Sequence, residues 1–235
     1  MNKQEASQVI DKIVKQVFGL NSPLSHEELI KKFTFDINLP NKVVDAVDGS
    51  DTWTASSSAT KFVKMYNARN NEATSSEGLF ATQPIKDLED LLSKWQHINY
   101  ITSEFALDSI NVSESDNIIS SENVFHSRDI VRSKNIIYSD NVIDSDYVFA
   151  SQGSVQVTFC IRADDSIRCA NSFGVTRSAD LTNCIMMHDC GDMQDSMFCS
   201  NMKGRRFCIA NMQFEEAEYH RLRQQVVQWI LNPSS

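Results

Sequence analysis

The chain of 235 residues carries a net charge of −9, and 41% of its residues are hydrophobic and 23% charged. These proportions are typical of a globular protein with one long domain or two small ones. The negative charge disfavours non-specific nucleic-acid binding, which needs clustered Lys and Arg, and no apolar run approaches the roughly 18 residues of a membrane helix.

The amino terminus leads into an amphipathic pattern and not into an apolar signal sequence. In residues 4–18, apolar residues recur at three- and four-residue spacing, which predicts a helix that ends at Gly19. Ser25 and Glu28 form a capping box ahead of a short second helix. Because no signal sequence is visible and a reduced setting is the simpler assumption for the six cysteines, we expect a cytoplasmic protein, or a component of a virus particle assembled in the cytosol.

Residues 34–83 have no clear periodicity. The polar stretch 49–58 surrounds Trp53 and predicts a loop or an irregular hairpin. We expect Pro84 to open a third helix with an apolar face made of Ile85, Leu88, Leu91, Leu92, Trp95 and Ile98. Residues 1–108 are thus predicted to form a small, mainly helical N-terminal domain.

From Ser109 to Ala210 the sequence repeats every six residues. The first place is Ser in eight consecutive hexads, and the fifth place is apolar in ten; the third place is Asn or Asp in twelve of seventeen. A helix cannot follow this period, because successive equivalents would rotate by about 240° around its axis. Short strands separated by corners can follow it, so residues 109–210 are predicted to form a parallel β-solenoid.

With three hexads per coil, the rod would be roughly 28 Å long at about 4.8 Å per rung, although four-sided coils also fit the repeat. The fifth place lies two residues before the next first place, so we expect both to point into the lumen. Asn at the third place suits a corner, because it tolerates a left-handed φ and its amide can stack on equivalent amides.

A last helix is predicted from Phe214 to Leu231, and Asn232-Pro233 ends it. Its expected apolar stripe consists of Leu222, Val226, Trp229 and Ile230. We expect this segment, residues 211–235, to cap the last rung, whose unpaired backbone groups would otherwise recruit another chain. The predicted fold class is α+β: a helical N-terminal domain, a β-solenoid and a capping helix.

The six cysteines occupy the first or fourth place of their hexads: Cys160, Cys169, Cys184, Cys190, Cys199 and Cys208. His188 lies near Cys184 and Cys190, which makes a zinc site conceivable. However, the chain has no CxxC pair and none of the usual zinc spacings. We therefore expect the cysteines to fill the core and expect neither a metal site nor a cofactor.

Many acyltransferases are hexapeptide solenoids, but their pattern places the large aliphatic residue two positions after the small one, whereas here the order is reversed. His126 and His188 fall at outward places without an evident partner to orient them. The ladder of equivalent serines has no uniquely activated member. We expect no catalytic residue and no enzyme activity.

Two further groups of residues have simple structural interpretations. We expect the acidic outer positions to form a solvated face rather than a mimic of DNA; they are Glu122, Asp129, Asp140, Asp144 and Asp146. Trp53, Trp95 and Trp229 are expected to be buried anchors.

The segment from Phe207 to Tyr219 resembles the end of uncharacterised, repeat-rich and often Cys-rich proteins of bacteria and their phages. Those proteins finish on a similar aromatic-Cys-Ile-x-Asn-x-Gln-aromatic stretch before an acidic helix. The resemblance covers about thirteen residues and the general style of the repeat. It implies a shared fold and carries no activity.

The fourth and fifth places are both apolar from Ile118 to Phe149. Adjacent residues on a strand point to opposite faces, so one of the two columns lies outside the rod unless it occupies a corner. An outer apolar stripe of that size predicts self-association as a dimer or trimer, or contact with the N-terminal domain.

The leading functional hypothesis is a non-enzymatic structural or protein-interaction protein that binds a protein partner or its own copies, such as a phage virion component or assembly factor. The alternatives are an acidic inhibitor of a nucleic-acid enzyme and a hexapeptide acyltransferase. We expect no direct binding of nucleic acid or membrane.

Overall fold

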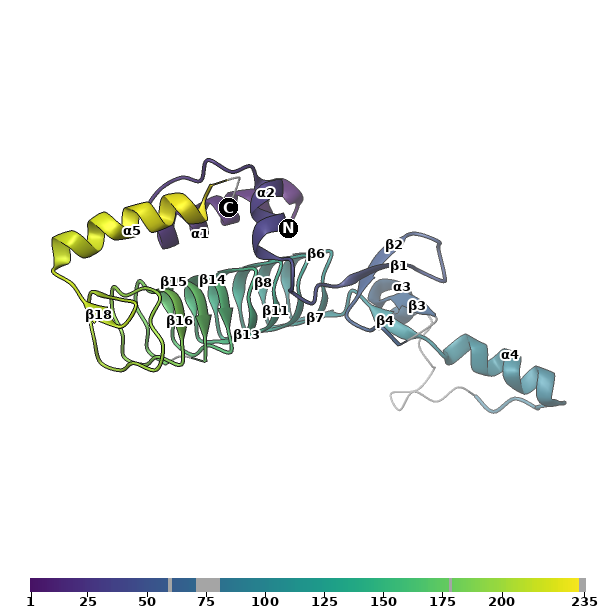
Figure 1. The fold of residues 1–235 in the computed structure, drawn as a ribbon. Coiled ribbons are helices and arrows are strands. Elements are labelled where there is room, and N and C mark those ends of the chain that lie inside the picture. Colours follow the sequence, from purple (N-terminus) through teal and green to yellow (C-terminus); the bar gives the residue numbers. More distant parts are fainter. Residues whose placement is uncertain (59–60, 71–80, 178, 233–235) are drawn as a thin grey trace.

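The computed structural model describes residues 1–58, 61–70, 81–177 and 179–232. It contains a parallel β-solenoid with helices along one side (Figure 1), which confirms the predicted fold class. The strands pair with partners twelve residues away, as Lys134 does with Asp146. Each coil therefore contains two hexads, and the premise that each hexad forms one side of a three- or four-sided coil is wrong. Because each rung uses fewer residues, the rod is longer than expected.

Alternate hexads form two separate parallel sheets, one of seven strands and one of five. The strands of the seven-stranded sheet are β6 (Ile110–Ser113), β8 (Glu122–Phe125), β10 (Lys134–Ile137), β12 (Asp146–Phe149), β14 (Thr158–Asp164), β15 (Ala170–Thr176) and β16 (Ile185–His188). Those of the five-stranded sheet are β5 (Ala106–Leu107), β7 (Asp116–Ile119), β9 (Arg128–Val131), β11 (Asp140–Ile143) and β13 (Gln152–Val155). Isolated bridges continue the twelve-residue register as far as Met197 and Ile209.

The corners of the coil lie at both the third and the sixth place of the hexad. Asn135, at a third place, has a φ of 54°, and Tyr138, at a sixth place, has a φ of 50°. Four such corners close a coil after twelve residues. Asn and Asp tolerate a left-handed φ better than other side chains, which explains their frequency at the third place.

The predicted amide stacking is present along one column of third places. The Nδ2 of Asn111 donates to Oδ1 of Asn123 at 2.8 Å, and that of Asn123 donates to Oδ1 of Asn135 at 3.1 Å. These bonds link successive rungs in addition to the backbone ladder, and they stabilise the Asn side chains at their corner positions.

The lumen is filled from the first and fourth places. The fourth-place residues Ile130, Ile136 and Val142 are fully buried there. The prediction that the first place points inward is confirmed, but the same prediction for the fifth place is wrong. The fifth place follows the fourth on the strand and therefore points away from the lumen.

The serines of the first place bond to the backbone inside the lumen. Ser127, for example, donates its N–H to Ser115 Oγ at 3.1 Å and its own hydroxyl to the carbonyl of Phe125 at 2.9 Å. Each hydroxyl therefore pairs one inward amide of the next coil, which would otherwise be buried without a partner.

Three helices cover the outside of the seven-stranded sheet: α1 (Lys3–Phe18), α2 (His26–Phe33) and α5 (Glu216–Ile230). The predicted capping box of Ser25 and Glu28 and the stop at Gly19 are confirmed. The rings of Phe18 and Phe33 lie 5.5 and 5.4 Å from that of Phe173, a fifth-place residue of β15. The helices and the solenoid thus share one apolar core.

The C-terminal helix was expected to cover the last rung, but α5 runs back along the side of the rod (Figure 1). Its Arg223 donates to the carbonyl of Val17 at 2.9 Å, which ties it to the C-terminal end of α1. Trp229 was predicted to be buried and is 56% exposed instead. Pro233, the expected end of the helix, lies outside the described residues.

Part of the last rung is completed by a side chain. The amide of Asn211 accepts the N–H of Ser200 and donates to the carbonyl of Ser200, both at 3.0 Å. Asn211 lies in the turn between β17 (Cys208–Ile209) and β18 (Met212–Gln213), which form a short antiparallel pair. This amide replaces the backbone groups that a further rung would supply.

The other end of the rod carries a small mixed unit. It consists of an antiparallel pair, β1 (Asn41–Val44) with β2 (Asp51–Thr54), a parallel pair, β3 (Phe62–Lys64) with β4 (Ile101–Ser103), and two helices, α3 (Met65–Asn70) and α4 (Leu88–Ile98). The hairpin predicted around Trp53 is therefore present in part, with Trp53 half-buried in β2. Buried Asp116 ties the unit to the rod by accepting the N–H groups of Ala55 and Phe105 at 2.7 and 2.8 Å.

Among the described residues, no helix combines the length and apolarity that crossing a membrane requires.

Candidate interaction surface

The fifth places of the five-stranded sheet form a continuous apolar column on the outside of the rod. We call it the apolar ladder; it consists of Leu107, Ile119, Val131, Ile143, Val155 and Ile167. Each member lies directly beside the next across the parallel register. The column continues with Ala179, Gly191 and Lys203, so its large apolar side chains end at Ile167.

Comparison with the opposite sheet shows that no element among the described residues covers the apolar ladder. Fifth-place residues under the helices, such as Phe149 and Ile161, are completely buried. In contrast, Leu107 and Ile167 at the two ends of the apolar ladder are 41% and 49% exposed, and the four residues between them are half-buried. Helices α1, α2 and α5 all lie on the other side of the rod (Figure 1).

Two of the acidic residues near the apolar ladder, Asp144 and Asp140, are paired with bases. Arg132 donates two bonds to the carboxylate of Asp144, at 2.6 and 2.8 Å, and both residues lie at corners beside the ladder. Arg128 Nε lies 3.2 Å from Asp140 Oδ1. Each such pair cancels one negative charge that a mimic of DNA would present, whereas the apolar ladder runs without interruption along this side.

Helix α4 carries the second large exposed apolar surface. Its N-cap is Asp87, whose side chain accepts the N–H of Asp90, so the helix begins later than the predicted start at Pro84. All apolar residues predicted for its face remain between 44% and 68% exposed: Ile85, Leu88, Leu91, Leu92, Trp95 and Ile98. Trp95, expected to be a buried anchor, is therefore exposed. The amphipathic face is formed as predicted, but no described element covers it.

The cysteines lie in the solenoid lumen or at its wall. All six are buried and free, and burial raises the pKa of the Cys169 thiol to about 11 and that of Cys184 to about 12. Thiols held in this way stay protonated near neutral pH and are poor nucleophiles and poor metal ligands. No cluster of potential metal ligands is found in the part of the chain that the structure describes.

His126 differs from the expected free surface histidine. Its Nδ1 lies 3.1 Å from Glu114 Oε2, and its ring packs near those of Phe125 and Tyr138, with centroids 6.3 and 5.1 Å away. Burial lowers the pKa of His126, against the opposing effect of Glu114. Glu114 and His126 are twelve residues apart, so only the twelve-residue coil brings them together. His188 is exposed, as expected.

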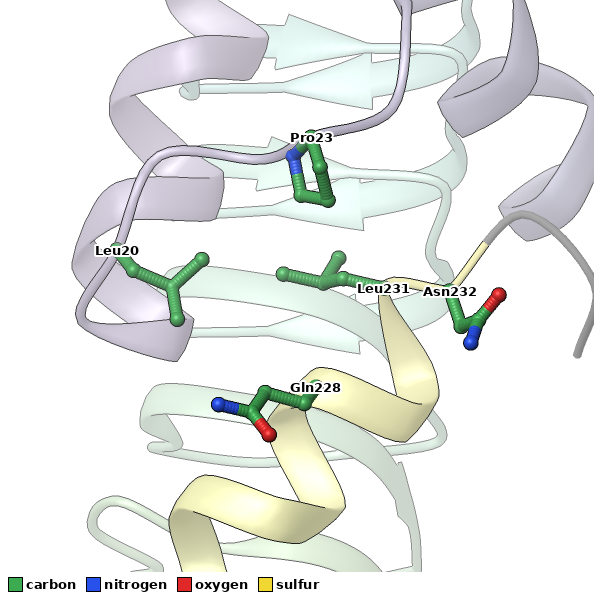
Figure 2. A pocket seen from close by; sticks show the side chains of 5 residues that line it. All are labelled: Leu20, Pro23, Gln228, Leu231 and Asn232. Carbon is green, nitrogen blue, oxygen red and sulfur yellow. The ribbon is translucent and has the colours of Figure 1, made fainter.

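The surface also has a shallow hollow of about 260 Å³ between the end of α1 and the end of α5. Figure 2 shows Leu20 and Leu231 pointing toward each other across it, with Pro23 and Gln228 at its edge. The hollow is lined by apolar side chains and amides and contains no acid, base or nucleophile. It therefore offers packing space but no catalytic group.

Comparisons with protein families, curated proteins and solved structures give no match.

Proposed function

We propose that the protein is a non-enzymatic structural or protein-interaction protein: a rigid rod that associates with its own copies or with a protein partner through the apolar ladder. The observation that carries this proposal is the difference between the two sheets. One has its fifth-place residues buried by three helices, whereas the other leaves the equivalent residues uncovered by any described element. A continuous exposed apolar stripe is a typical mark of an association site.

Rigidity supports the same role. Each rung bonds to its neighbours through backbone ladders, serine hydroxyls and stacked amides, so the spacing of the outer side chains is fixed before binding. A preorganised surface loses little conformational entropy on association. A virion component or an assembly factor would suit such a rod, in the cytoplasm or in the particle.

The test uses Val131→Glu combined with Ile143→Glu, which places two carboxylates at the centre of the apolar ladder. Both positions are half-buried and outside the lumen, so the fold should survive. We expect size-exclusion chromatography with light scattering to show a larger mass for the wild type than for this variant. The matched control, Thr158→Glu with Thr182→Glu, adds the same charge at exposed places of the other sheet and should associate like the wild type. Equal masses for the wild type and this double variant would refute self-association through the apolar ladder.

A further inference from the structure

The chain exposes two apolar surfaces at once, the apolar ladder and the face of α4. We propose that α4 of one copy lies on the apolar ladder of a second copy, and that α4 of the second copy lies on the apolar ladder of the first. This inference rests on the proposed function and names the partner of its site: a second copy of this chain, bound through an amphipathic helix.

The protein already contains a contact of this kind. On the opposite sheet, α1 lies across β10, β12, β14 and β15. Its apolar residues, among them Ile13 and Val17, are buried against the fifth-place residues of those strands. The apolar ladder presents the same place of the hexad at the same strand spacing. It therefore offers an amphipathic helix an equivalent packing surface.

The lengths of the two surfaces agree. α4 has 11 residues and is therefore about 16 Å long at 1.5 Å per residue. The six side chains of the apolar ladder extend over about 24 Å at roughly 4.8 Å per rung. The apolar ladder can accept the whole helix, and its end residues, Leu107 and Ile167, lie at or just beyond the helix ends.

The position of α4 makes its own chain an unsuitable partner. The helix extends beyond the end of the rod, away from the solenoid and on the side opposite α1 and α5 (Figure 1). Lys61 Nζ donates to the carbonyl of Gln96 at 2.6 Å, which fixes the C-terminal turn of α4 to the end unit. Only two residues separate α4 from β4. The helix therefore points toward the space that a second, oppositely directed rod would occupy.

Two reciprocal contacts give an interface of sufficient size. The exposed parts of the six ladder side chains and of the apolar face of α4 together offer on the order of 800 Å² to one contact. Two such contacts related by a two-fold axis reach the roughly 1,200–2,000 Å² of stable protein interfaces. A single contact would bury less area than most stable interfaces do, so the inference requires a closed dimer with both contacts.

The experiment combines two variants of the full chain, each with one surface removed. The helix variant is Leu88→Glu with Leu92→Glu, and the ladder variant is Val131→Glu with Ile143→Glu. In a reciprocal dimer each variant alone loses both contacts, so each should sediment as a monomer. A mixture of the two keeps one intact contact, between α4 of the ladder variant and the apolar ladder of the helix variant, and should form a weaker heterodimer.

Controls and a second measurement keep the outcomes separate. Ser93→Glu with Gln96→Glu places the same charge on exposed polar residues of α4 and should leave the dimer intact. In a mixture of ¹⁵N-labelled and unlabelled wild type, a reagent that joins amines to carboxylates should link Lys94 of one copy to Asp129 or Asp144 of the other.

Three results would overturn the inference while leaving the proposed function in place: a helix variant that stays dimeric, a mixture that shows no heterodimer, or a dimer without cross-links between α4 and the ladder flank. A ladder variant that stays dimeric, or a monomeric wild type, would refute both the inference and self-association through the apolar ladder.

Discussion

Val142 and Ile143 are neighbours on β11, and they lie on opposite sides of the solenoid wall. Val142 is completely buried in the lumen, whereas Ile143 belongs to the apolar ladder and is half-buried. We predict that Val142→Asp strongly destabilises the rod and that Ile143→Asp changes its stability little. Ile137 would not distinguish the two sides, because it is buried beneath α1 although it is a fifth-place residue.

The magnitudes follow from burial. Replacing the Val142 side chain removes about 1.5–3 kcal/mol of stabilisation that comes from its apolar burial. Holding an unpaired carboxyl neutral at pH 7 costs roughly a further 4 kcal/mol. The sum is about 6 kcal/mol, which matches the whole stability of many domains. Ile143→Asp keeps its carboxylate in water and should cost at most about 1 kcal/mol.

The assay is urea unfolding followed by circular dichroism at pH 7. Because Val142→Asp can prevent folding, Val142→Thr and Ile143→Thr give a milder comparison: a hydroxyl buried in the lumen should cost about 1–3 kcal/mol, and one at the surface about 0.5 kcal/mol or less. Equal losses for the two Thr variants, or a larger loss at Ile143, would refute the assignment of the fourth place to the lumen.

Three further predictions follow from the lumen and from one buried acid. Ser139→Ala removes the acceptor of the Ser151 N–H, 3.2 Å away, and should cost about 1–3 kcal/mol in urea unfolding; no loss would contradict the role of the serine ladder. Burial raises the pKa of Asp164 to about 6, so ionisation penalises the fold increasingly as the pH rises from about 4 to 6, and fully above pH 6. Asp164→Asn should therefore be more stable than the wild type at pH 7, by about 1 kcal/mol after allowance for partial exposure. This advantage should shrink below pH 6 and vanish near pH 4, and a constant difference would contradict it. Chelation should leave the melting curve unchanged, and stoichiometric zinc by elemental analysis would overturn the packing role of the cysteines.

The sequence was sufficient to predict the solenoid and one of its two kinds of corner. Asn and Asp recur at the third place because a left-handed φ costs them little, so the pattern was visible. The sixth place is also left-handed but holds residues as different as His126, Tyr138 and Ala150, and no residue type marked it. Without that corner the number of hexads per coil stayed open between three and four, whereas the structure has two.

The direction of the fourth and fifth places could not be decided from composition. Both are apolar from Ile118 to Phe149, since one fills the lumen and the other packs under helices or forms the apolar ladder. The sequence correctly indicated an outer apolar stripe, but only the two-hexad coil divides it into a covered half and an uncovered half. Trp95 and Trp229 were misplaced because a large aromatic residue is usually buried in its own chain.

The mass of the full wild-type chain in solution tests the central claim most directly. We predict that sedimentation equilibrium at tens of micromolar gives twice the chain mass, and that the mass falls toward that of one chain on dilution. A mass of one chain at every concentration, with α4 and the apolar ladder still exposed to hydrogen exchange and labelling, would contradict the claim that this rod associates through its uncovered sheet.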